Sequence, residues 1–197
     1  GIPFTYTGYP MVKLARDLVR SGELGKVDKV VLEYVQGSFR KVDFSKPLDR
    51  HNAWKMNPKI SGPSCVVADI GVHAFTMVEY VTGLEAKTLL ADLSSFAPGN
   101  KLDDDASILM RLGSAKGGAR GASAKASLVV SKIATGEEND VFVKLPIRRG
   151  IVTELDLHLQ NVAFSHRFPP FKACLVASGL HTRAVSTEKN DGIFRRA

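Results

Sequence analysis

An aspartate and a histidine four residues apart are the residues of this sequence best suited to carry out chemistry. Asp69 and His73 have the i, i+4 spacing that puts two side chains on one face of a helix. Histidine exchanges a proton near neutral pH, and a nearby carboxylate orients it or tunes its pKa. A plainer interpretation also stays open, in which Asp69 caps the first helical turn and His73 is a hydrogen-bonded polar residue.

The residues around this pair predict the elements that position it. Apolar residues recur at helical spacing over residues 68–82, and Gly83 follows as a helix end. The preceding stretch, residues 38–65, is rich in proline and scattered charges, which indicates a long loop of the kind that often binds ligands. We therefore expect Asp69 and His73 near a helix start, beside a long binding loop.

The remaining pattern predicts one sheet and a second helix. The second helix is expected over residues 10–21, with Pro10 at its first position. A strand rich in Val and aromatic residues follows at 29–36, and three consecutive strands are expected at 87–96, 107–112 and 122–133. This order predicts an α+β fold, a mostly antiparallel open sheet with helices packed on one face.

Composition places the chain among ordinary folded domains. Hydrophobic residues make up 44% of the 197 residues and charged residues 24%, which allows both a core and solubility. No apolar run approaches the roughly 20 residues of a membrane-spanning helix, so we expect no membrane partner. Cys65 and Cys174 cannot form a disulfide framework of the secreted kind, which favours a cytoplasmic location.

The net charge of +7 raises the question of nucleic acid. Residues 1–138 carry 18 Lys and Arg against 15 Asp and Glu, so most of the chain is close to charge balance. We therefore expect no nucleic-acid partner; a basic binder would instead show salt-sensitive affinity for DNA. The acidic run 103–105 lacks further acids at calcium-loop spacing, so a charged turn is expected there and no metal site.

Short motifs follow one another along the chain at residues 5–12, 15–16, 21–27, 33–37, 54–55, 61–62, 69–74, 81–85, 102–105 and 135–139. Together they resemble the Gfo/Idh/MocA oxidoreductases, which include inositol dehydrogenases and glucose–fructose oxidoreductase. The resemblance extends over about residues 4–139, and its order and spacing make it specific. The active-site stretch of the family is matched at 69–74.

The resemblance implies roles for the central pair. The histidine at the position of His73 is the usual proton donor or acceptor, and the aspartate at the position of Asp69 hydrogen-bonds the substrate or orients the site. The family binds NAD or NADP mainly through an N-terminal Rossmann domain, which also supplies a catalytic lysine in a Glu-Lys-Pro motif. Neither that motif nor G-x-G-x-x-G occurs here. The expectation is a C-terminal substrate domain whose Rossmann domain is missing, inactive alone.

Five further residues are candidate substrate contacts. Tyr6 and Tyr9 would lie at the domain junction, and Gln36 at a strand end. Trp54 and Lys55 lie in the long loop, where an aromatic face and a charge suit a sugar-like substrate. Each has a structural alternative, such as Tyr9 packing before the helix or Trp54 filling the core.

The resemblance ends near Asn139, which divides the chain into a domain over 1–138 and a divergent tail over 139–197 without a clear domain. The tail is either a genuine ending or a translated frame shift. Two functions remain open. The first is the substrate side of an NAD(P)-dependent oxidoreductase acting on a sugar, polyol or related secondary alcohol, forming a homo-oligomer through its sheet face. The second is a non-catalytic oligomerisation or interaction module derived from that family.

Overall fold

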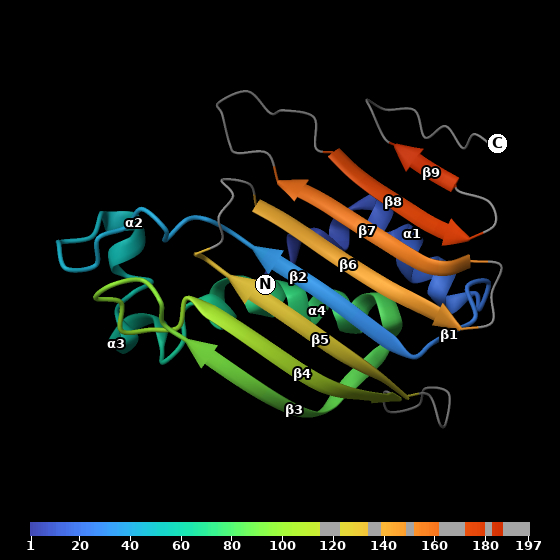
Figure 1. The fold of residues 1–197 in the computed structure, drawn as a ribbon, viewed down its shortest axis with the longest axis horizontal. Helices are drawn as coiled ribbons and strands as arrows, with labels where there is room; N and C mark the ends of the chain where they lie inside the picture. The colour runs from blue at the N-terminus through green and yellow to red at the C-terminus, as the bar shows by residue number, and fades with distance from the viewer. Residues whose placement is uncertain (115–122, 134–138, 149–151, 162–171, 180–182, 187–197) are drawn as a thin grey trace.

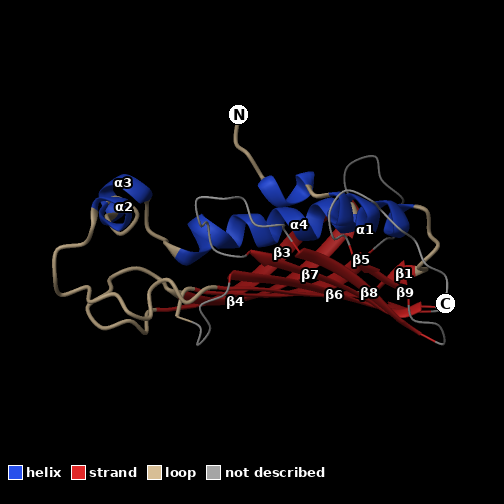
Figure 2. Cartoon of the chain, turned by 90° about the horizontal axis from the view of Figure 1, so that it is seen from above, coloured by secondary structure: helices blue, strands red, loops and turns tan. Residues whose placement is uncertain are grey.

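One twisted sheet and two long helices make up most of the described part of the chain. The computed structural model describes residues 1–114, 123–133, 139–148, 152–161, 172–179 and 183–186. Both helices lie across the same face of the sheet, which is seen edge-on in Figure 2. Among the described helices, none combines the length and apolar composition that a bilayer crossing needs. The expected class, α+β with helices on one face of a mostly antiparallel open sheet, is confirmed.

The sheet runs in the order β3-β4-β5-β2-β6-β7-β8-β9, with β1 paired to β6 (Figure 1). β2 is parallel to β5, and the other described pairs are antiparallel. The strands are β1 Lys26–Val27, β2 Lys29–Val35, β3 Leu84–Ser94, β4 Asp105–Ser114, β5 Ser123–Ser131, β6 Asn139–Arg148, β7 Val152–Asn161, β8 Lys172–Gly179 and β9 Arg183–Ser186. The three strands expected as a meander are β3, β4 and β5.

The first long helix, α1, spans Pro10–Arg20 and buries Met11, Val12 and Ala15 against the sheet. It follows a short 3-10 turn, Thr5–Gly8, and starts at Pro10 as expected. Its end is set by Gly22, whose φ of 75° is a left-handed conformation that side-chain-bearing residues rarely adopt.

The second long helix, α4, spans Val72–Thr82 and is preceded by a π-helical turn, Val67–Gly71. The sequence predicts one regular helix over residues 68–82. The structure corrects this prediction, because the first turn is a wider π turn. A π turn cannot be recognised from apolar spacing because the buried residues keep nearly the same face. Ala74, Met77, Val78 and Val81 point into the core beneath the helix.

The long loop expected over residues 38–65 contains two single-turn helices, α2 at Arg50–Ala53 and α3 at Pro58–Ser61. Asn57 caps α3, because its side chain accepts a hydrogen bond from the Lys59 backbone N–H at 3.0 Å. The base of the loop has its own small core of Phe39, Cys65 and Leu102. These contacts hold the loop beside the start of the π turn.

After residue 138 the described chain continues in the same sheet. β6 pairs with β2, and β7 to β9 extend the sheet from it. The domain boundary drawn at residue 138, and the origin of the tail, stay predictions. The expected glycine-rich turn over 113–121 lies mostly outside the described residues.

Candidate active site

The π turn that carries Asp69 is held in place by a buried aspartate from a different part of the chain. The Asp103 carboxylate accepts hydrogen bonds from the backbone N–H groups of Cys65, at 2.6 Å, and Val67, at 3.1 Å. The Ser64 hydroxyl donates to it as well, at 3.0 Å. Asp103 was expected in a charged turn, yet only 8% of its surface is exposed. Its role is to anchor the backbone just before Asp69.

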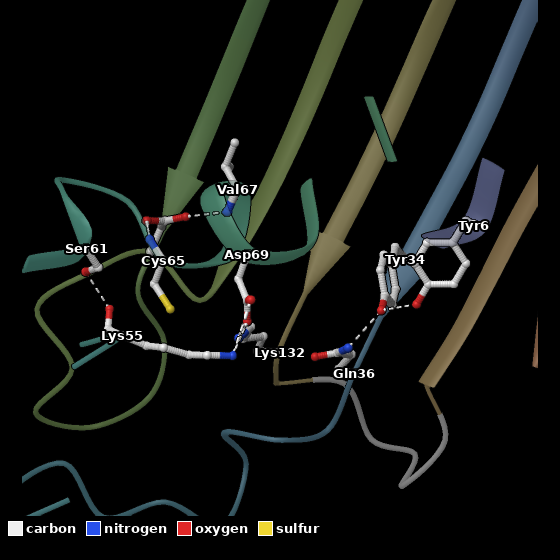
Figure 3. Close-up of polar contacts among 10 residues, drawn as sticks. Tyr6, Tyr34, Gln36, Lys55, Ser61, Cys65, Val67, Asp69 and Lys132 are labelled. Carbon is white, nitrogen blue, oxygen red and sulfur yellow. Dashed lines mark hydrogen bonds and ion pairs between the residues drawn. The ribbon is translucent and has the colours of Figure 1, made fainter. Parts of the chain in front are cut away.

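Asp69 sits between two lysines from different segments (Figure 3). The Lys55 ammonium group lies 3.3 and 3.1 Å from its two carboxylate oxygens, and Lys132 binds the second oxygen too. Burial alone would raise the pKa of Asp69. The hydrogen bonds and charges of Lys132 and Lys55 outweigh that effect, so the pKa lies below its ordinary value. Asp69 is therefore ionised at neutral pH.

Lys55 is positioned by the loop. The Ser61 hydroxyl lies 2.7 Å from the Lys55 carbonyl oxygen, which ties α3 to the segment before it. The side chain of Lys55 then extends from the loop toward Asp69 (Figure 3). Lys132 directly follows β5, and its backbone N–H donates to the Asp104 carbonyl at 2.8 Å.

His73 lies one turn after Asp69, at the start of α4. Its ring packs edge-on against Tyr6, with ring centroids 5.3 Å apart, and against Phe4, at 5.9 Å. Burial lowers the pKa of His73, and the negative charge of Asp69 partly offsets this. The imidazole is therefore neutral at neutral pH and can accept a proton. Among the described residues, nothing hydrogen-bonds its buried Nδ1 atom.

Two tyrosines and a glutamine form a hydrogen-bonded group next to His73. The hydroxyl groups of Tyr6 and Tyr34 are 2.6 Å apart, and the Gln36 amide donates to Tyr34 at 3.1 Å. Burial raises the pKa of Tyr34, although its hydrogen bonds to Tyr6 and Gln36 oppose this. The Tyr34 phenol therefore keeps its proton at neutral pH and can serve as a hydrogen-bond donor.

These groups open onto one cavity of about 340 Å³. Its walls come from β2, the long loop, the π turn, the start of α4 and the residue after β5. Two lysine ammonium groups, one aspartate carboxylate and a neutral imidazole therefore face the same cavity. The lining residues are Tyr34, Gln36, Ser38, Phe39, Asn52, Lys55, Asp69, Ile70, His73 and Lys132.

The structure brings together most of the candidate site residues, but not all of them. Asp69, His73, Gln36 and Lys55 line the cavity. Tyr6 lies behind it, in contact with His73 and Tyr34.

Two candidates lie farther out. Tyr9 packs edge-on against Tyr6, with ring centroids 5.8 Å apart. Trp54 is 50% exposed and does not line the cavity, although the Lys55 ammonium lies 5.8 Å from its ring centroid. Trp54 is therefore not the core residue of the structural alternative.

Sequence reasoning missed Lys132 and Tyr34. Only 3% of Lys132 is exposed, which is rare for a lysine unless it is paired. The available signal is a lysine directly after an apolar strand, which most often indicates a solvated strand end. Tyr34 belongs to the alternating pattern of β2, where a buried tyrosine resembles any core residue.

Comparison with known protein families agrees with this fold. Residues 12–145 match the family model of the GFO/IDH/MocA C-terminal domain. The match covers more than half of the chain, so the chain belongs to this family of oxidoreductase domains.

Individual similar proteins are named oxidoreductases. The uncharacterized oxidoreductase YfiI of Bacillus subtilis strain 168 is 30% identical over 112 residues, which are 56% of this chain and 28% of YfiI. An oxidoreductase from Sinorhizobium meliloti is 29% identical with a TM-score of 0.64, covering 96% of this chain and 43% of that one.

Structures of lower identity share the fold. An inositol dehydrogenase homolog from Azotobacter vinelandii, complexed with NAD+, has a TM-score of 0.73 at 22% identity, covering 99% of this chain and 45% of that one. A levoglucosan dehydrogenase complexed with NADH and levoglucosan has a TM-score of 0.66 at 21% identity, and the match covers 93% of this chain and 46% of that one. The chain thus spans less than half the length of these similar proteins.

Proposed function

We propose that this chain forms the substrate side of an NAD(P)-dependent oxidoreductase that acts on a secondary alcohol of a sugar, polyol or related compound. The observation that carries the proposal is the cavity in which a neutral His73 and an ionised Asp69 face the same space. Similar folds occur in proteins whose structures hold NADH with myo-inositol or levoglucosan, which supports this substrate class.

His73 is proposed to move the hydroxyl proton of the substrate. A nicotinamide cofactor supplies hydride transfer at a carbinol carbon, so the hydroxyl proton needs a separate acceptor. A neutral imidazole lining the cavity can take it, and Asp69 stabilises the imidazolium that forms. Gln36 and the Tyr34 hydroxyl are placed to hydrogen-bond neighbouring hydroxyl groups of the substrate.

The described residues do not themselves fit a dinucleotide. No described strand leads through a glycine-rich turn into a long helix, which is the arrangement that holds a pyrophosphate. α1 instead follows a 3-10 turn. We therefore assign no residue of this chain to NAD or NADP, and propose that an N-terminal Rossmann domain holds the cofactor as a partner of this one.

The test compares this chain with a two-domain protein in which a nucleotide-binding domain precedes it. The two-domain protein should reduce NAD or NADP in the presence of a sugar or polyol, measured by the absorbance of the reduced nicotinamide. This chain alone should show no turnover and no micromolar cofactor binding by calorimetry. Micromolar binding by the chain alone would overturn the assignment of the cofactor to the other domain.

A second candidate function is a non-catalytic oligomerisation or interaction module. Leu90 and Leu109 are paired neighbours on β3 and β4, on the sheet face away from the helices, and are 70% and 56% exposed. Exposed apolar neighbours often mark a protein interface. We propose that this face forms a homo-oligomer, which is compatible with either function.

Light scattering after gel filtration tests the interface. Leu109→Glu should lower the measured mass to that of a monomer, because it places a charge in the proposed contact. An oligomer that persists in Leu109→Glu would contradict the sheet-face contact. An oligomer without any turnover in the two-domain protein would favour the non-catalytic module.

A further inference from the structure

The charges around Asp69 do not balance. Lys55 and Lys132 both bind this carboxylate, and Asp69 is the one carboxylate among the described residues that line the cavity. The neighbouring acid, Asp103, is bound to backbone N–H groups of the π turn instead. Among the described residues that line the cavity, two ammonium groups therefore share one carboxylate, so this lining carries one positive charge more than it has carboxylates.

Both lysines keep hydrogen-bond donors for an occupant of the cavity. An ammonium group has three donors. Lys55 directs two contacts to Asp69, and Lys132 directs one. Counting contacts among the described residues, at least one N–H of each lysine is left, and both side chains line the same cavity.

Solvent cannot easily neutralise the remaining charge. The side chain of Lys132 is 3% exposed and that of Lys55 is 19% exposed. The Lys132 ammonium also lies 4.6 Å from the centroid of the Phe39 ring, which shields it on one side. An unbalanced charge held away from water is costly unless a counter-charge binds beside it.

We propose that the cavity takes an anionic substrate, a sugar acid whose carboxylate is held between Lys55 and Lys132. This inference rests on the proposed function and names the substrate class of the same site. The carboxylate binds the free lysine donors, while a hydroxyl group of the same molecule faces His73. One remaining positive charge matches a carboxylate, whereas a phosphate monoester carries about 1.5 to 2 negative charges.

Three compounds with the same six-carbon skeleton test the inference. D-Glucitol is neutral, D-gluconate carries a carboxylate, and D-glucitol 6-phosphate carries a phosphate. Calorimetry with this chain at constant low salt should give gluconate an affinity about 10-fold or more above that of glucitol, as one charged hydrogen bond provides. The two-domain protein should likewise have a higher kcat/KM for the acid than for glucitol.

Replacing each lysine tests whether the preference for gluconate over glucitol comes from Lys55 and Lys132. Lys132→Met and Lys55→Met should each weaken gluconate binding about 10-fold more than they weaken glucitol binding, because only gluconate carries the carboxylate that the lysines hold. Lys13→Met, on the exposed face of α1, is the matched control and should change neither. Should Lys132→Met fail to fold by circular dichroism, Lys55→Met, on the loop, carries the test.

Equal binding of gluconate and glucitol, absence of binding by all three compounds, or an acid preference that persists in the lysine variants would each overturn the inference. Stronger binding of the phosphate would overturn the choice of carboxylate. Oxidation of glucitol with no preference for the acid would leave the proposed function standing without this inference. Lysine-dependent gluconate binding without oxidation of any alcohol would support this inference and contradict the proposed function.

Discussion

At the scale of single residues, His73 is the group on which the proposed chemistry depends. In the two-domain protein, His73→Ala should lower kcat by about 10²–10⁴-fold, the usual contribution of a positioned acid–base group. Asp69→Asn should cost less and should raise KM as well, because Asp69 binds both lysines and its proposed role is to orient the site. Steady-state kinetics with circular dichroism measures both effects.

The stability of the fold provides the control for this prediction. His73 makes edge-on ring contacts with Phe4 and Tyr6, while Ala74 and Met77 form the buried side of α4. Loss of the imidazole should therefore cost about 1 kcal/mol. If His73→Ala unfolded the domain but left turnover per folded molecule intact, His73 would be a packing residue and not the proton carrier.

The protonation of His73 gives a second prediction at this scale. Burial lowers its pKa, so NMR titration should find the pKa of His73 below the ordinary value of about 6.5. Asp69→Asn should lower the pKa further, because the negative charge of Asp69 favours the imidazolium. A pKa that rises in Asp69→Asn would contradict this electrostatic description.

The same shift links His73 to stability. A histidine whose pKa is lower in the folded state binds fewer protons there than in the unfolded state. Its contribution is fully present above the ordinary pKa and is lost as pH falls from that value through the lowered one. Asp69, whose pKa is also lowered, loses its contribution at more acidic pH. Both groups therefore make the domain less stable in acid.

At the scale of elements, the π turn depends on Asp103. Asp103→Ala would leave two backbone N–H groups and the Ser64 hydroxyl without their acceptor. We expect the free energy of unfolding to fall by about 3 kcal/mol, as for lost hydrogen bonds to a buried charge. Chemical denaturation measures the change. Asp92→Ala, on the exposed surface of β3, is the matched control and should change it by less than about 0.5 kcal/mol.

Substrate binding should respond to Asp103 too. The π turn presents Asp69 to the lysines, so a looser turn should raise KM more than a distant change of equal stability cost. A fully stable Asp103→Ala variant would show that other contacts hold the turn.

At the scale of the whole molecule, the division at residue 138 can be tested directly. If residue 138 is the boundary of the domain, residues 1–138, which contain the core around α1, α4, β2, β4 and β5, should fold cooperatively alone. The shortened chain should melt at a lower temperature than the full chain, because β2 loses its pairing with β6. Calorimetry and circular dichroism measure this. A shortened chain without a cooperative transition would contradict a boundary at 138.

Much of this architecture follows from local sequence patterns. The apolar spacing of α1 and α4, Pro10 at a helix start and Gly83 at a helix end depend on neighbours along the chain. The strand alternation over β4 and β5 is local as well. The i, i+4 relation of Asp69 and His73 also follows from sequence, because the helical repeat fixes which side chains share a face.

The tertiary structure alone decided what surrounds Asp69. Lys55 lies 14 residues before it and Lys132 lies 63 residues after it, and no local pattern predicts that their ammonium groups meet at one carboxylate. The contact arises because β5 ends beside the π turn while the loop folds over both. Asp103 likewise anchors backbone N–H groups 36 and 38 residues away. Sequence determines which chemical groups the chain carries and their local faces, whereas the packing of distant segments determines which of those groups share one low-dielectric cavity.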